Sequence, residues 1–178
     1  MDYIIDFILL ALIYYFLYKK WSKESIGSLI IKSLMYVYLV MVLYVTLMPF
    51  TIPFSGNNNL FLETANAIPF RDVMLKYDGA IREVFLNILM MVPLGFLYPI
   101  IKKKGVIRTL ITTFLFSLFI ECSQLLGVWW GSTGVRIFDV TDLITNTIGG
   151  LVGFLMYCLI KPVVFKIYKG IQSGNISN

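Results

Sequence analysis

The sequence predicts an all-α protein that spans a membrane as a bundle of about five helices. Hydrophobic residues make up 58% of the chain and charged residues 14%, whereas soluble domains have roughly 45–50% and about 25%. The apolar residues gather into five runs, each close to the roughly 20 residues that cross a bilayer. The runs lack the alternation of barrel strands, and a backbone in lipid must satisfy its own hydrogen bonds, so we expect helices.

The five predicted spans follow one another along the chain with polar gaps between them. The first is the shortest, and because the N-terminus carries Asp2 and Asp6 instead of a basic leader, we expect a retained helix and no cleaved signal. In the fifth, Gly149-x-x-x-Gly153 predicts a close helix contact within the chain. The runs cover approximately Tyr3–Tyr18, Leu29–Pro49, Val84–Ile101, Val106–Leu126 and Leu143–Val164.

Basic residues in the gaps predict the orientation of the bundle. Cytoplasmic loops of membrane proteins carry an excess of lysine and arginine, and here that excess lies after the first and third spans and at the C-terminus. We therefore expect the N-terminus outside and the C-terminus in the cytoplasm. The residues behind this prediction are Lys19, Lys20, Lys23, Lys32, Lys102, Lys103, Lys104, Arg108, Lys161, Lys166 and Lys169.

The spans divide the chain into four segments of one membrane domain. Residues 1–50 hold the two N-terminal spans, and residues 51–83 form an extracytoplasmic loop. Residues 84–165 form a core of the last three spans, and residues 166–178 form a cytoplasmic tail. We expect a multi-pass protein of the cell membrane.

Composition argues against several kinds of partner and chemistry. The net charge of +5 comes from basic residues spread over short gaps, so we expect no nucleic-acid partner. The chain has no histidine, which removes His-based acid/base catalysis and makes a zinc site unfavourable; we expect no metal and no other cofactor. Cys122 and Cys158 belong near opposite membrane faces, so we expect unpaired thiols in the core.

Polar side chains converge near the predicted outer surface. Glu121 lies inside the fourth span, where a charged side chain costs roughly 3 kcal/mol unless it is paired or hydrated. Ser117, Glu121 and Gln124 are spaced i, i+4, i+7 and share one helix face. Asn87 and Asn146 enter the third and fifth spans at a similar depth. Three helices thus bring polar groups to one layer.

This layer predicts a pocket that combines carboxylates, amides and guanidinium groups. Asp139, Asp142 and Asn146 follow i, i+3, i+7 at the start of the last span, close to Arg136. If the protein is an enzyme, the candidate catalytic residues are Glu121, Asp139 and Asp142. The candidate ligand-binding residues are Arg82, Asn87, Gln124, Arg136 and Asn146.

Structural roles are open for the same residues. Asp139 can be an N-cap with Asp142 in a capping-box arrangement, both favoured by the helix dipole, and Arg136 can pair with either. The three amides can equally be hydrogen-bonding links between helices.

Four segments of the chain resemble the VanZ-like family of bacterial membrane proteins. They are residues 66–70 (NAIPF), 87–96 (NILMMVPLGF), 120–125 (IECSQL) and 136–142 (RIFDVTD) leading into 146–149 (NTIG), and the likeness covers roughly residues 66–154. The first two spans match only in being apolar. The matching hallmark positions are Asn87, Pro93, Gly95, Glu121, Gln124, Arg136, Asp139, Asp142, Asn146 and Gly149.

The resemblance implies a bacterial cytoplasmic membrane and a role in low-level resistance to teicoplanin, a glycopeptide with a lipid tail. One hypothesis is an outer-leaflet pocket that binds or shields an amphiphile, either a lipoglycopeptide or a lipid-linked cell-wall precursor. The alternative is a membrane enzyme that uses Glu121, Asp139 and Asp142 on a lipid-linked or headgroup substrate. A translocator would need polar groups through the inner leaflet, where the sequence offers almost none. The expected partners are membrane lipid and these amphiphiles, with the oligomeric state open.

Overall fold

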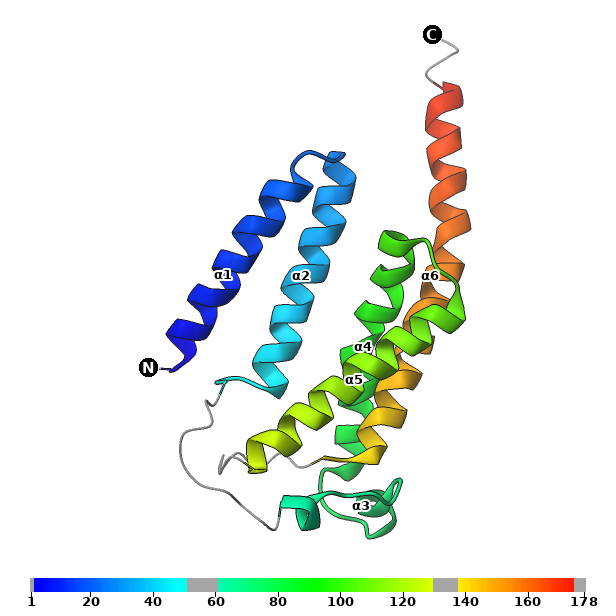
Figure 1. The fold of residues 1–178 in the computed structure, drawn as a ribbon. Coiled ribbons are helices and arrows are strands. Elements are labelled where there is room, and N and C mark those ends of the chain that lie inside the picture. Colours follow the sequence, from blue (N-terminus) through cyan, green and yellow to red (C-terminus); the bar gives the residue numbers. More distant parts are fainter. Residues whose placement is uncertain (1, 51–60, 130–137, 175–178) are drawn as a thin grey trace.

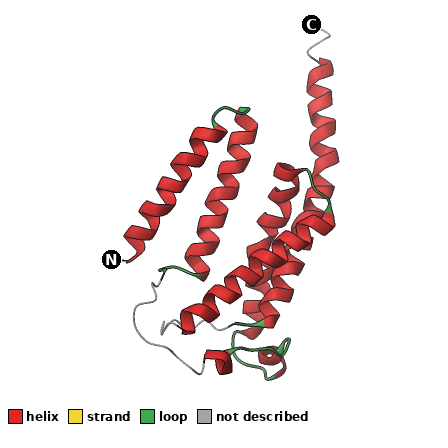
Figure 2. Ribbon diagram, viewed as in Figure 1, coloured by secondary structure: helices red, strands yellow, loops and turns green. Residues whose placement is uncertain are grey.

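The computed structural model describes residues 2–50, 61–129 and 138–174. Within these ranges the chain is helical apart from short connections and one isolated β-bridge (Figure 2). The elements are α1 (Asp2–Trp21), α2 (Ile26–Thr46), the 3₁₀-helix η1 (Phe61–Thr64), α3 (Arg71–Met74), α4 (Ala80–Lys102), α5 (Val106–Trp129) and α6 (Val140–Gly174).

The prediction of an all-α membrane protein is confirmed. Four helices are long and apolar enough to cross a membrane, namely α2, α4, α5 and the Val140–Pro162 part of α6. The helix α1 is similar in length. However, its charged residues, among them Asp6, Lys19 and Lys20, leave no stretch of 18 residues within it that has fewer than three charged residues. Whether α1 crosses the membrane therefore stays a prediction, as does the orientation of the bundle.

The two ends of the bundle differ in charge. The α1–α2 turn, the α4–α5 connection and the C-terminal end of α6 lie at the same end (Figure 1), which we call the basic end because most of the lysines counted above lie there. η1, α3 and the first residues of α4 and α6 lie at the opposite end, which we call the acidic end. Helices that alternate in direction explain this separation.

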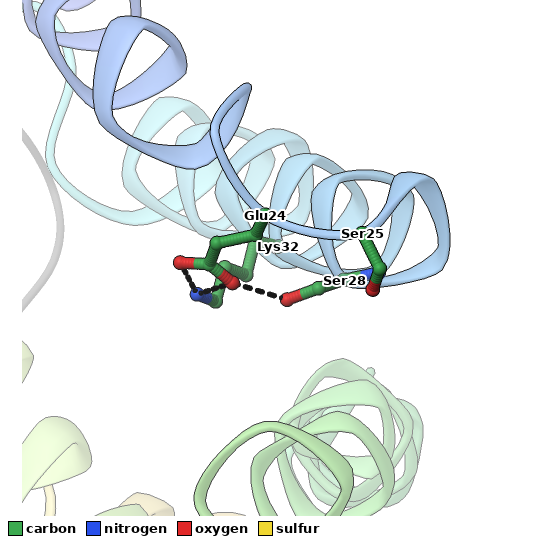
Figure 3. Close-up of polar contacts among 4 residues, drawn as sticks. All are labelled: Glu24, Ser25, Ser28 and Lys32. Carbon is green, nitrogen blue, oxygen red and sulfur yellow. Dashed lines mark hydrogen bonds and ion pairs between the residues drawn. The ribbon is translucent and has the colours of Figure 1, made fainter.

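A compact polar cluster closes the α1–α2 turn at the basic end (Figure 3). Ser25 caps α2 by accepting from the Ser28 amide at 3.4 Å. Glu24 accepts from the Ser28 hydroxyl at 2.5 Å and forms an ion pair with Lys32. The bond from Lys32 and then that from Ser28 lower the pKa of the Glu24 carboxyl below its ordinary value.

At the other end of the same hairpin, the acidic side chain of Asp6 in α1 has a backbone hydrogen-bond partner just beyond α2. Its side chain is buried and accepts a hydrogen bond from the Phe50 amide at 3.0 Å. Phe50 follows the end of α2, so this bond fixes the start of α1 to the segment that leaves α2. A backbone donor thereby satisfies a carboxylate that the apolar helix surface could not.

Helices α4 and α6 run in the same direction and touch through glycine. A Cβ on Gly149 would lie 2.1 Å from the Ile88 carbonyl oxygen, and one on Gly153 would lie 2.1 Å from that of Val92. Gly95 approaches the Gly150 carbonyl in the same way. Because no side chain fits at such distances, glycine sets the spacing of the two helices, and the predicted contact within the chain is confirmed.

The two cysteines are unpaired as predicted, but their expected place in the core is wrong. Both Cys122 and Cys158 are free and exposed on their helices. A helix that is apolar on all sides gives no amphipathic pattern from which its buried face can be read.

Candidate functional site

The carboxylate of Glu121 is buried among the helices and bonds to the backbone of another element. Its side chain is 1% exposed, on a face of α5 that also buries Ser117. Its Oε2 accepts from the amide N–H of Asp139 at 2.9 Å. Glu121 therefore links the middle of one helix to the residue that precedes α6, a structural role for a group that lipid would otherwise destabilise.

Asp139 is the N-cap of α6. Its Oδ1 accepts from the Thr141 amide at 2.6 Å, while its Oδ2 accepts from Nδ2 of Asn66 at 2.9 Å. The N-cap alternative for Asp139 is thus the arrangement found. In a capping box the third helical residue would accept from the Asp139 N–H; here Glu121 of α5 takes that place instead of Asp142.

Asn66 joins the segment after η1 to the start of α6. The backbone N–H of Asn66 donates to the Phe138 carbonyl at 2.8 Å, and the backbone carbonyl of Asn66 accepts from the Val140 N–H at 3.0 Å. These two bonds make a parallel β-bridge between Asn66 and Asp139. Asn66 is 4% exposed. In the sequence, Asn66 stood out only as part of the NAIPF segment. An asparagine next to apolar loop residues could have indicated a buried polar side chain that holds the loop in place.

A small acidic cavity lies directly beyond this network. Its volume of about 20 Å³ is enough for roughly one water molecule. Four carboxylates contribute to its wall, and two of them, on Asp72 and Glu83, were not among the predicted site residues. The lining residues are Phe70, Asp72, Val73, Ala80, Glu83, Val84, Asp139, Thr141 and Asp142. Within the described ranges, no three acidic, cysteine or histidine residues converge closely enough to hold a metal ion.

The cavity wall is fixed to the helix start by a second backbone contact. The amide of Phe70 donates to Oγ1 of Thr141 at 3.0 Å, and Thr141 is buried. The segment before α3 is therefore held against the first turn of α6 by both Asn66 and Thr141. Thr141 was also missed, since a threonine at a helix start is common and carries no specific signal.

The remaining predicted residues that the structure describes do not line this cavity. Asn146 bonds to Ser117 across α5 and α6 at 2.8 Å, and Gln124 donates to the Thr46 carbonyl at the end of α2 at 3.3 Å. These amides link helices, as the alternative reading proposed. Asn87 is half-buried and Arg82 is exposed, and neither takes part in these hydrogen bonds. Arg136 lies outside the described residues.

Two further buried hydroxyl groups lie on α5, between Ser117 and the basic end. Thr109 and Thr113 are 0% exposed, whereas we expected almost no polar groups there. Each donates to a carbonyl four residues earlier, at 3.1 and 3.0 Å. Thr113 also lies against Gly150: a Cβ added to this glycine would be 2.5 Å from the Thr113 hydroxyl. The threonines are small, internally satisfied residues in a tight contact and give no support to a path through the bundle.

Carboxylates thus occupy two distinct environments at the acidic end. Glu121 and Asp139 have oxygens bonded to N–H donors and hold three segments together. Asp72, Glu83 and Asp142 border the cavity with Asp139. A cavity with this wall favours hydrogen-bond donors and cationic groups, because carboxylates accept hydrogen bonds and carry negative charge.

Comparison with known proteins agrees with the motifs. No solved structure matches the chain. Protein VanZ of Enterococcus faecium is 26% identical over 134 residues, which are 75% of this chain and 76% of that protein. The VanZ/LLP1 family profile matches residues 35–161, a range that begins within α2 and extends into α6. The chain belongs to the VanZ/LLP1 family.

Proposed function

We propose that this protein lowers the susceptibility of a bacterium to the lipid-tailed glycopeptide teicoplanin. In this proposal the acidic end faces outward and its polar pocket binds or shields an amphiphile, either the antibiotic or the lipid-linked cell-wall precursor that the antibiotic attacks. The cavity of about 20 Å³ takes only a donor or cationic group of that amphiphile. Family membership supports the resistance role, because the VanZ-like family is associated with teicoplanin resistance.

One observation carries the pocket part of the proposal. The acidic cavity is built on a network in which Glu121, Asp139 and Asn66 join α5, α6 and the segment after η1 through bonds of 2.9 Å. A ligand that meets a fixed wall loses less free energy to ordering than one that meets mobile loops. A site at a helix end near the membrane surface also suits a ligand with a polar head and an apolar tail.

Susceptibility measurements test the proposal. The full chain, Glu83→Gln and Asp142→Asn would be expressed at equal levels in a sensitive Gram-positive host, with Glu63→Gln as the control. Glu63 is an exposed acid in η1 outside the cavity. We expect the wild type and the control to raise the minimum inhibitory concentration of teicoplanin but not of vancomycin, which lacks the lipid tail. The two cavity variants should lose protection.

A wild-type protein that protects against neither drug would overturn the resistance role. Protection that survives both cavity substitutions would keep the role and remove the acidic cavity from it. The two parts of the proposal can therefore fail separately.

The alternative function is an envelope enzyme that uses Glu121, Asp139 and Asp142 on a lipid-linked or headgroup substrate. Asp139 and Asp142 favour it, because they line one cavity with two further carboxylates and paired acids can perform acid/base work; Glu121 does not line that cavity. The backbone and amide bonds to Glu121 and Asp139 favour binding instead. Lipid extracts from cells with the wild type and with Glu121→Gln would decide, because an enzyme should change a lipid species only when Glu121 is intact.

A further inference from the structure

The side-chain amide of Asn146 is buried, and only its Nδ2 has a hydrogen-bond partner among the described residues. The residue is 1% exposed, in the second turn of α6. Its Nδ2 donates to Oγ of Ser117 on α5 at 2.8 Å. Its Oδ1 has no hydrogen-bond partner among the described residues. A buried carbonyl oxygen of this kind is rare, because its lost hydration is not replaced.

In the orientation that the structure records, neighbouring hydroxyls do not supply the missing donor. The nearby hydroxyls of Thr113 and Thr145 already donate to carbonyls, of Thr109 at 3.0 Å and of Thr141 at 2.9 Å. Asn146 Oδ1 therefore stays without a hydrogen-bond donor among the described residues.

Ser117 offers the complementary half of a binding site. It is 0% exposed, and in the described hydrogen bonds it only accepts, from Asn146. Its hydroxyl proton can therefore donate to a further acceptor. A group that accepts from Ser117 and donates to Asn146 Oδ1 would satisfy both residues, and a water molecule does both.

We propose that Asn146 and Ser117 bind one internal water molecule in the contact between α5 and α6, one helical turn from Glu121. A cation would need several oxygen ligands, whereas this site offers one amide oxygen and one hydroxyl. A larger ligand would meet the close contact of the same two helices, where a Cβ added to Gly150 would lie 2.5 Å from the Thr113 hydroxyl. The water site is independent of the ligand that the acidic cavity takes.

An experimental structure of the full chain in lipid nanodiscs, at a resolution that shows ordered water, tests the proposal directly. We expect a solvent peak within hydrogen-bond distance of both Asn146 Oδ1 and Ser117 Oγ. A structure in which Oδ1 accepts directly from a protein donor, or in which the side chains pack with no peak between them, would overturn it.

A matched pair of serine substitutions in α5 provides the second readout. Ser117→Ala removes one ligand of the water and should abolish the peak and lower the Tm by roughly 2–10 °C. Ser123→Ala removes a hydroxyl that donates to the Phe119 carbonyl of its own helix at 2.7 Å, and should keep the peak and shift the Tm by less than about 2 °C. A Ser117→Ala protein that retains the peak contradicts the proposal; if this variant does not fold, the wild-type structure decides.

Discussion

At the scale of single residues, the carboxylates of Glu121 and Asp139 act first as hydrogen-bond acceptors for backbone groups. Glu121 accepts from the Asp139 amide, and Asp139 accepts from the Thr141 amide. An unpaired donor in a buried place costs about 1–3 kcal/mol. The effect of a substitution should therefore depend on whether an acceptor is retained, more than on charge.

Glu121→Gln and Glu121→Ala separate these effects. Glutamine keeps an oxygen that can accept from Asp139, whereas alanine leaves the amide unpaired, so we expect Glu121→Ala to lose about 1–3 kcal/mol more of the free energy of unfolding. Thermal unfolding in detergent measures the difference, with Glu63→Ala as an exposed control. Equal Tm values for the two Glu121 variants would show that the acceptor is unimportant.

An exchange of the Asn66 and Asp139 side chains tests their contact. Asp139→Asn should destabilise the protein, because its amino group would face that of Asn66, with which the carboxylate now bonds at 2.9 Å. Asn66→Asp in the same chain restores one donor and one acceptor and should recover part of the lost Tm. Additive losses in the double variant would mean that the two residues are not coupled.

The contacts of Glu24 at the basic end predict that the stability of the protein depends on pH. Its pKa is lowered in the folded chain by Lys32 and then Ser28, so its contribution to stability is present above the ordinary carboxyl pKa and is lost as the pH falls through the lowered value. We expect Glu24→Gln to lower the Tm slightly at neutral pH and to match the wild type in strong acid. A Tm difference that grows on acidification has the wrong sign for this contact.

At the scale of elements, the α4–α6 contact depends on positions where only hydrogen fits. Gly149→Ala or Gly153→Ala would place a methyl group 2.1 Å from a carbonyl oxygen, so the helices must separate, at a cost of about 1–3 kcal/mol or more. Gly105→Ala is the control, since nothing lies within 4 Å of its added Cβ. The Tm and the monodisperse fraction after extraction should fall for the first two variants only.

At the scale of the whole molecule, separation of charge between the two ends predicts the orientation in the membrane. In a chain whose Cys122 and Cys158 are replaced by serine, we expect Asp78→Cys and Asp2→Cys to react with a membrane-impermeant maleimide on intact cells. Lys103→Cys should react only after lysis. Labelling of Asp78 alone on intact cells would place the N-terminus inside and remove α1 from the spanning helices.

The membrane class, four of the spanning helices and the family motifs can be predicted from the sequence alone. These follow from quantities local to the chain: the length of an apolar run and the order of residues such as Glu121 and Asp139. The sequence also allowed a cap at Asp139, because a cap acts within one helical turn.

The segments that those groups connect became clear from the three-dimensional arrangement of the helices. Glu121 and the Asp139 amide are 18 residues apart, and the Asn66 and Asp139 side chains are 73 apart. The exposure of Cys122 and the burial of Asn146 depend likewise on which faces of apolar helices meet. Hydropathy does not distinguish lipid from a neighbouring helix, so packing alone selects the partners.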